Sequence, residues 1–308
     1  MLPTAGAQAA APIMLTGLDA HDGMITQVGS TYYLYGTRYG CGFTWTVHGP
    51  FCGFGVWQST DKQNWQFVRL LFDPNANDAY RNISWINDCG NGGCFNPRMM
   101  QRQSDGVWIL YFNSPADFSW NGSNAYYVMG CAGPAGPCGD TPDAGPHASM
   151  HKPNMTICYH NGDFSIFYAV DGHAYIYCTM WNQTIRVEQL DAWWANGNGV
   201  GGTISTQPNV ESPGMYRDAA TGYYVLTYSL PNCGYCGSDG MGYAVASSPL
   251  GPFVAAPTPI AMRAGQPRTV SFIDGQPVEW WDLWNNGARN ETTAAVQLVT
   301  INPGLPPQ

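Results

Sequence analysis

Four stretches of the sequence share a pattern that decides the fold: VGSTYYLYGT (28–37), SDGVWILYFN (104–113), VDGHAYIYCT (170–179) and ATGYYVLTYS (220–229). In each stretch, a turn that contains glycine leads into a strand rich in aromatic and β-branched residues. A second strand repeats in part, at 127–130 and 243–246. A recurring unit of this kind is typical of the four-stranded blades of a β-propeller. We therefore predict an all-β chain that folds as a single five-bladed β-propeller.

The repeat also sets the boundaries of the predicted domain, which spans residues 13–308. Its units begin near Gly17, Phe95, Asp163, Glu211 and Gln266. The small, Ala-rich segment 1–12 is interpreted as the remnant of a processed secretory segment and is excluded from the fold. Strand-like runs cover residues 31–37, 55–60, 107–113, 125–131, 164–169, 174–180, 223–229, 242–247, 269–273 and 295–301. The nearest approach to an amphipathic helix is VEQLDAWW (187–194).

The charge balance excludes several classes of partner. The formal net charge is −9, and Lys62 and Lys152 are the only lysines. Nucleic acids and anionic membrane surfaces bind basic proteins, so neither is an expected partner. No apolar run reaches the roughly 20 residues of a membrane-spanning helix. We expect a monomer.

Ten cysteines and five N-x-S/T sequons indicate the secretory route. The cysteines that lie close in sequence are Cys41 and Cys52, Cys89 and Cys94, Cys131 and Cys138, Cys158 and Cys178, and Cys233 and Cys236. Their glycine-rich surroundings predict disulfides made in an oxidising compartment, with loops closed at Cys41–Cys52 and Cys131–Cys158. The sequons are at Asn82, Asn121, Asn154, Asn182 and Asn290. We therefore expect a secreted, extracellular glycoprotein.

Three acidic motifs open repeat units and are similar to motifs of a known enzyme family. They are Asp22-Gly-Met-Ile-Thr-Gln-Val-Gly, Asp163-Phe-Ser-Ile-Phe and Glu211-Ser-Pro-Gly-Met-Tyr. In this order they resemble the first, third and fourth blades of glycoside hydrolase family 43, whose members are five-bladed propellers. The resemblance extends from about Gly17 to Ile301.

The resemblance implies one role for each acid. Asp22 would be the general base that activates water, Asp163 would tune the pKa of the acid, and Glu211 would be the general acid. Inverting hydrolysis needs a carboxylate and a carboxylic acid about 6.5–9.5 Å apart, with room for water between them. The innermost strand of each propeller blade begins near the axis, so acids far apart in the sequence can meet in one pocket.

Further segments resemble the exo-β-1,3-galactanase branch of the family. They are HDG (21–23), VEQL (187–190), Gln266 with Thr269-Val270, and WDLWN (281–285). That branch usually lacks an acid at the position of Asp22, and Asn96-Pro97-Arg98 stands where it has Arg-Pro-Lys. The sugar is therefore left open between galactose, arabinose and another pentose.

Candidates for substrate binding are His21, Arg98, Glu188, Gln266, Trp181 and Trp284, with Trp45, Trp85 and Trp120 as further aromatic candidates. His21 adjoins the predicted base, and Gln266 would orient the attacking water or a hydroxyl. Arg98 and Glu188 would contact ring hydroxyls of the sugar. Aromatic rings stack on the apolar C–H faces of sugars. For each candidate the alternative is a structural role in a turn or between blades.

No required cofactor is expected, because the sequence has neither an EF-hand loop nor an HExxH motif. The family resemblance allows a structural calcium ion on the propeller axis. The expected function is that of a secreted inverting exo-glycosidase that removes terminal galactosyl or arabinosyl residues from plant-type cell-wall polysaccharides. The alternatives are an α-L-arabinofuranosidase or β-xylosidase and, in another class, a non-catalytic sugar-binding propeller.

Overall fold

A computed structural model describes residues 13–41, 51–75, 77–78, 83–84, 89, 93–114, 126–139, 150–151, 153–160, 162–230, 240–257, 265–283 and 295–300. These residues form β-strands and turns, and none of them forms a helix. The predicted remnant at 1–12 lies outside the described residues. The described part of the chain therefore contains no helix long and apolar enough to cross a membrane.

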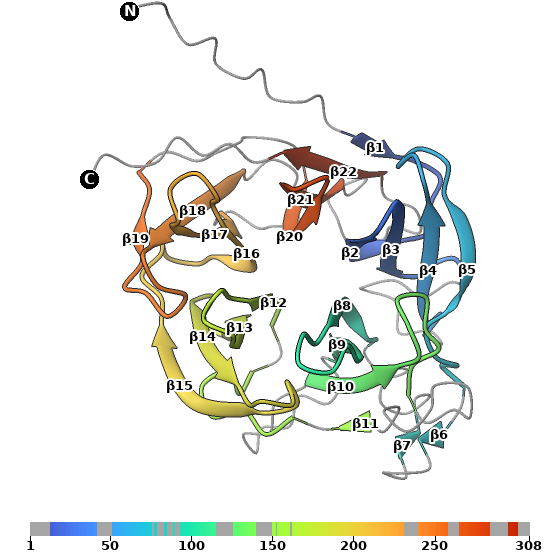
Figure 1. Cartoon of the computed structure of the whole chain (residues 1–308), viewed down its shortest axis with the longest axis horizontal. Coiled ribbons are helices and arrows are strands. Elements are labelled where there is room, and N and C mark those ends of the chain that lie inside the picture. The colour runs from blue at the N-terminus through green and yellow to red at the C-terminus, as the bar shows by residue number, and fades with distance from the viewer. Residues whose placement is uncertain are drawn as a thin grey trace, which may run out of the picture.

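Five four-stranded antiparallel sheets are arranged around a central axis (Figure 1). The first contains β2 (His21–Val28), β3 (Thr31–Thr37), β4 (Phe54–Ser59) and β5 (Gln66–Leu70). The second contains β8 (Phe95–Gln101), β9 (Trp108–Asn113), β10 (Tyr126–Cys131) and β11 (Met150–His151). The third contains β12 (Phe164–Tyr168), β13 (Ala174–Thr179), β14 (Ile185–Leu190) and β15 (Gly197–Thr203). The fourth contains β16 (Glu211–Arg217), β17 (Tyr224–Ser229), β18 (Met241–Ala246) and β19 (Val254–Ala255).

The fifth sheet joins the two ends of the chain. It contains β20 (Gln266–Ile273), β21 (Gln276–Leu283), β22 (Ala295–Thr300) and, on its outer edge, β1 (Ile13–Leu15). The N-terminal strand pairs with β22 in the register Ile13↔Leu298 and so closes the ring. A separate two-stranded ladder joins β6 (Asn77–Asp78) and β7 (Ile83–Ser84). The all-β propeller arrangement is thus confirmed, with four blades of continuous chain and a composite sheet at the closure.

The predicted repeat coincides with the sheets. Phe95, Glu211 and Gln266 are the first residues of the innermost strands β8, β16 and β20, and Asp163 directly precedes β12. The helix-like pattern at 187–194 is instead the end of β14 followed by a turn. Val187, Leu190 and Trp194 of this segment are buried, whereas Ala192 and Trp193, which belong to the turn, are exposed.

The recurring strand carries the contacts between neighbouring sheets. Its eighth residue is the fully buried Tyr35, Tyr111 or Tyr177 in the first three copies. Each hydroxyl donates to a carbonyl oxygen in a turn of the next sheet, Pro134 at 2.7 Å, Trp194 at 2.6 Å and Pro249 at 2.7 Å. Buried tyrosines need such partners, because an unpaired buried hydroxyl costs about 1–3 kcal/mol. The repeat visible in the sequence is therefore the set of residues that attach each sheet to the next.

The described residues contain four disulfides, Cys41–Cys52, Cys89–Cys94, Cys131–Cys138 and Cys158–Cys178. The expected disulfide framework is confirmed for these pairs of sequence neighbours. The predicted Cys131–Cys158 loop is wrong, because Cys131 pairs with Cys138 across the turn that follows β10, and Cys158 pairs with Cys178 of β13. Cys233 and Cys236 lie outside the described residues.

Candidate active site

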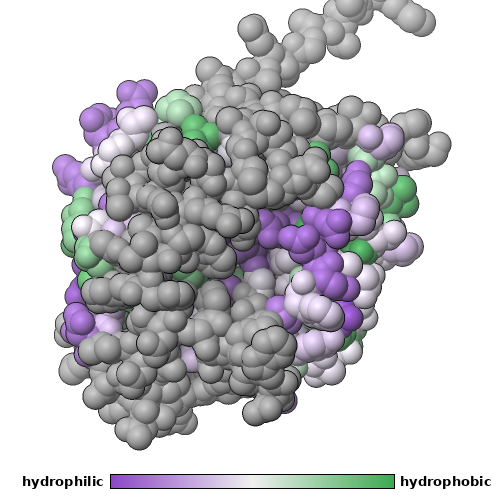
Figure 2. Space-filling view, turned by 180° about the vertical axis from the view of Figure 1, so that it is seen from behind, coloured by the Kyte–Doolittle hydropathy of each residue, from purple (hydrophilic) through white to green (hydrophobic). Residues whose placement is uncertain are grey.

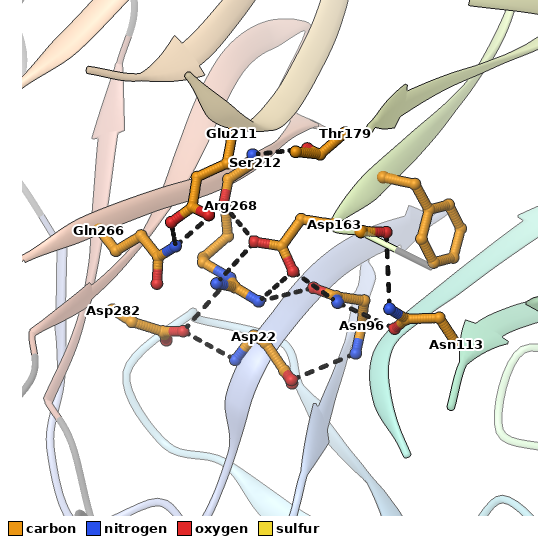
Figure 3. Close-up of polar contacts among 12 residues, drawn as sticks. Asp22, Asn96, Asn113, Asp163, Thr179, Glu211, Ser212, Gln266, Arg268 and Asp282 are labelled. Carbon is orange, nitrogen blue, oxygen red and sulfur yellow. Dashed lines mark hydrogen bonds and ion pairs between the residues drawn. The ribbon is translucent and has the colours of Figure 1, made fainter. Parts of the chain in front are cut away.

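The candidate site lies where the innermost strands of the five sheets begin. The polar side chains that meet there include Asp22, Asn96, Asp163, Glu211, Ser212, Gln266, Arg268 and Asp282 (Figure 3). From the side opposite to Figure 1, hydrophilic residues border a hollow near the middle of the molecule (Figure 2). The structure therefore brings the three predicted acids into one cluster, although up to 189 positions separate them, from Asp22 to Glu211.

The same irregularity of the backbone occurs in three of the innermost strands and turns their side chains toward one another. Asp22, Asn96 and Ser212 are each the second residue of an innermost strand, with φ angles of 46°, 57° and 55°. In all three strands the register with the neighbouring strand shifts at this point. A left-handed backbone is rare for residues other than glycine, and bulges with this effect occur next to active sites. Such local strain persists when the surroundings hold it in place.

Asp163 is the most heavily bonded of the acids. Its carboxylate accepts hydrogen bonds from Ser212 Oγ and from Asn96 Nδ2, the latter at 2.9 Å. Arg268 approaches both of its oxygens, with Nη1 3.0 Å from Oδ2 and Nη2 3.2 Å from Oδ1. Burial works to raise the pKa of Asp163, but Arg268 and the two hydrogen bonds outweigh burial and hold this pKa below its ordinary value. Asp163 is therefore an ionised group at neutral pH.

Asp22 has the opposite electrostatic balance. It is 1% exposed, and burial raises its pKa from 3.8 to about 6. Arg268 acts against this shift, and the nearby Asp282 carboxylate adds to it. Its carboxylate accepts from Thr37 Oγ1 at 2.5 Å and from the backbone N–H of Asn96 at 3.2 Å. A carboxylate held in this way can take up a proton near pH 6.

Glu211 is the first residue of β16 and is partly exposed. Gln266, which is fully buried at the start of β20, donates from Nε2 to Glu211 Oε1 at 2.9 Å. The same amide donates to Ser212 Oγ at 3.1 Å, and Ser212 in turn donates to Asp163. One chain of hydrogen bonds therefore links Gln266, Glu211 and Asp163 across three sheets.

Two charged residues of the cluster had no predicted role. Arg268 is 5% exposed and, besides its contacts with Asp163, donates to Asn96 Oδ1 at 2.7 Å. Asp282 is fully buried and accepts the backbone N–H of Asp22 at 2.9 Å and Trp280 Nε1 at 2.8 Å. A sequence signal was available for Arg268. It follows Gln266 by two positions on the same strand, and side chains two positions apart on a strand tend to share one face of the sheet.

Arg98 does not face a sugar pocket as predicted. It is 2% exposed, and its guanidinium lies between the innermost strands of three sheets. Nε donates to the carbonyl oxygen of Phe164 at 3.0 Å, and Nη1 donates to that of Asp22 at 2.7 Å. Longer contacts reach the carbonyl oxygens of Gly23 and Pro97, both at 3.3 Å. Arg98 therefore holds the backbone of Asp22 in place rather than presenting donors to a ligand.

Among the described residues, the carbonyl oxygens that surround Arg98 are a poor place for the calcium ion that the family resemblance allows. Carbonyl oxygens such as those around Arg98 are ligands that calcium accepts. The guanidinium already supplies the positive charge among them, and a second cation would meet it directly. Within the described ranges no group of three or more His, Cys, Asp or Glu side chains could hold a metal ion. These residues do not fit an axial cation.

Glu188, another predicted sugar contact, lies outside the cluster. This carboxylate is fully buried in β14 and accepts four backbone N–H groups, those of Thr156, Ile157, Cys158 and Gly199, at 2.8–3.1 Å. Its role is to fix the segment that packs against the outer strands of the third sheet.

His21 and the aromatic candidates differ in where they lie and in how exposed they are. His21 is fully buried, stacks on Tyr39 with ring centroids 4.0 Å apart, and approaches Asp19 Oδ1 at 3.7 Å through Nε2. Trp181 is 75% exposed and lies two residues after β13, at the end of the sheet where Thr179 pairs with Asp163. The other candidates, Trp45, Trp85, Trp120 and Trp284, lie outside the described residues.

A β-propeller whose strand starts gather carboxylates around one opening has the features of a glycoside hydrolase. The chain belongs to glycosyl hydrolases family 43, whose family model matches residues 12–277. No curated protein matches the chain.

Solved structures share this fold at low sequence identity. An exo-β-1,3-galactanase from Phanerochaete chrysosporium in complex with galactose superposes with a TM-score of 0.69 at 20% identity, over 94% of this chain and 64% of that one. An exo-β-1,3-galactanase from Clostridium thermocellum gives 0.62 at 16% identity, over 92% of this chain and 59% of that one. A thermostable family-43 glycoside hydrolase gives 0.66 at 20% identity, over 96% of both chains. The chain thus spans less than two thirds of either galactanase.

Proposed function

We propose that the protein is a secreted, inverting exo-glycosidase that removes terminal galactosyl residues from a β-linked galactan. The observation that carries the proposal is the hydrogen-bonded cluster in which Asp22, Asp163 and Glu211 meet although they belong to three sheets. Secretion is supported by the four disulfides, which persist in oxidising compartments.

In this proposal Asp22 is the general base. Its pKa of about 6 leaves it ionised at neutral pH yet basic enough to accept a proton from water. Asp282 and Arg98 fix the backbone of Asp22 from opposite sides of the peptide, through its N–H and its carbonyl oxygen. The carboxylate is thereby positioned before substrate arrives.

Glu211 is then the general acid. Because Gln266 donates to Oε1, that oxygen acts as an acceptor, and the proton to be transferred resides on Oε2. The ionised Asp163 lies one serine away and disfavours a second negative charge on Glu211, which is the direction that a general acid requires. The sugar would bind between Glu211 and Asp22, with Trp181 at the rim as a stacking surface for the departing part of the chain.

The choice of a galactosyl substrate is supported by the structural similarity to exo-β-1,3-galactanases. Arabinosyl and xylosyl substrates are the competing choices within the family. The retained acid at Asp22 favours ordinary base catalysis for any of them.

The test is product release from β-1,3-galactan, arabinogalactan, arabinan and xylan by the wild type and by Glu211→Gln. We expect wild-type protein to release galactose from β-1,3-galactan and the variant to lose activity by about 10²–10⁴-fold. Glu188→Gln is the matched control, since it neutralises a buried carboxylate outside the cluster. Release of arabinose or xylose alone would overturn the sugar assignment. Tight sugar binding without turnover in the wild type would indicate a non-catalytic propeller.

A further inference from the structure

A second cavity lies at the other end of the second and third sheets from the acidic cluster. It encloses about 470 Å³ and is lined by residues of the turns that follow β8, β12 and β14, such as Gln103, His173 and Asp191. Strands β8 and β12 begin at the acidic cluster and end at this cavity, so the length of a strand separates the two sites. The volume is within the range of pockets that bind small ligands.

The lining combines an exposed aromatic face with hydrogen-bonding groups. Tyr168, the last residue of β12, is 40% exposed and packs on Trp194 with ring centroids 5.4 Å apart. The polar residues of the lining are Gln103, Ser104, His173, Gln189, Asp191 and Asn198. A sugar ring presents an apolar C–H face and a rim of hydroxyls, which match these two features.

The turn that carries Trp194 is held rigidly. Asp191 Oδ1 accepts the backbone N–H groups of Trp193 at 3.1 Å and Ala195 at 2.9 Å. The carbonyl oxygen of Trp194 accepts the hydroxyl of Tyr111 from the second sheet, at 2.6 Å. Trp194 keeps a φ of 56°, which is uncommon for a bulky residue and needs such support. The aromatic wall is thus formed before any ligand binds, which reduces the ordering cost of binding.

The charges around the cavity disfavour an anionic ligand. Arg102, at the base of the first turn, is paired with Asp105 and covers one face of the Trp193 ring at 5.5 Å. His173 Nδ1 lies 3.5 Å from Asp171 Oδ1. Because Arg102 and His173 each have an acidic neighbour, neither supplies excess positive charge to a phosphate or carboxylate ligand.

We propose that this cavity is a second carbohydrate-binding site, which holds a neutral stretch of the polysaccharide chain while the acidic cluster hydrolyses another. The proposal rests on the proposed function for the identity of the polymer. Trp193, which is 67% exposed next to this wall, would extend the contact along the chain.

The test measures retardation in native gels that contain soluble β-1,3-galactan, with Glu211→Gln in every protein to prevent hydrolysis. Adding Tyr168→Ala is expected to weaken retardation about tenfold, because one stacking face is lost. Tyr168→Phe keeps the ring and should restore it. Gln103→Ala changes an exposed turn residue, so it tests the cavity without risk to the core and should weaken binding by a smaller factor.

The matched control is Phe67→Ala. Phe67 is 49% exposed and has Arg38 over its ring at 5.2 Å, but it lies on the outer strand β5, away from the cavity. Equal retardation of Tyr168→Ala and Phe67→Ala would overturn the proposal. So would a loss of activity on a small aryl β-galactoside when Tyr168→Ala is made with Glu211 intact, or self-association of the wild type that Tyr168→Ala abolishes. Failure of the proposed function would be seen separately, as absent turnover in the wild type.

Discussion

Asp163 and Glu188 belong to the same sheet, yet they are bonded in opposite ways. Glu188 is satisfied by four backbone N–H groups, three from the segment 156–158 and one from β15 of its own sheet. Asp163 is satisfied by the side chains of Asn96, Ser212 and Arg268, which come from three other sheets. A carboxylate that is held by nearby backbone groups stabilises the fold. A carboxylate that is held by side chains from several sheets belongs to a site whose protonation and contacts can change.

Two of the buried arginines, Arg98 and Arg268, repeat this contrast. Arg98 donates mainly to carbonyl oxygens and holds strands together. Arg268 contacts the side chains of Asp163, Asn96 and Asp282 and sets the charge of the cluster. Buried charge is therefore not itself a mark of function in this molecule, and the type of partner is what separates the two roles.

The largest effect is expected for Asp22→Asn. The substitution keeps the size of the side chain but removes the proton acceptor, so kcat should fall by about 10²–10⁴-fold. Binding of galactose, measured by calorimetry, should change little. Turnover that stays at the wild-type level would remove Asp22 from the mechanism.

The second-largest effect is expected for Arg268→Met, on the free energy of unfolding. It leaves Asp163 and Asp282 without their shared cation, and breaking a buried ion pair costs about 3–5 kcal/mol of unfolding free energy. Because Arg268 lowers the pKa of Asp163, the variant should also shift the activity profile along the pH axis. Denaturant unfolding measures the first effect, and Arg268→Lys, which keeps the charge, is the control. A loss below about 1 kcal/mol would contradict the central role of Arg268 in the cluster.

Glu188→Gln should have a smaller and purely structural effect. The neutral amide keeps one acceptor oxygen but weakens the bonds to four N–H groups, and hydrogen bonds to a charged group contribute about 1.5–3 kcal/mol each at most. We expect a lower unfolding midpoint with unchanged kcat/KM. A fall in kcat/KM comparable to that of Asp22→Asn would abolish the distinction between the two kinds of carboxylate.

The smallest effect is the dependence on pH. Activity should fall about tenfold per pH unit below pH 6, because the base Asp22, whose pKa is about 6, becomes protonated. The same raised pKa means that folded Asp22 holds its proton more tightly than unfolded Asp22. Its contribution to stability therefore declines as the pH rises from 3.8 to about 6. A rate profile that is flat between pH 4 and pH 7 would contradict the assignment of the base.

The sequence was sufficient to predict the repeat, the start of most units and the meeting of the three acids, because alternating aromatic strands and turn residues are local signals. It was insufficient for Arg98 and Glu188, since a pattern within one strand does not say whether a side chain meets its own sheet or the axis. The left-handed backbone at Asp22, Asn96 and Ser212 was not predicted either, because glycine, the residue that marks such positions most strongly, stands at none of the three. Arg268 and Asp282 were missed because their partners come from other sheets.

The most direct test of the central claim is the anomeric form of the first product. Proton NMR recorded during hydrolysis of β-1,3-galactan should show α-galactose before mutarotation, because a base that activates water inverts the configuration. Release of β-galactose as the first product would mean that a carboxylate attacks the sugar directly. The roles proposed for Asp22 and Glu211 would then be wrong.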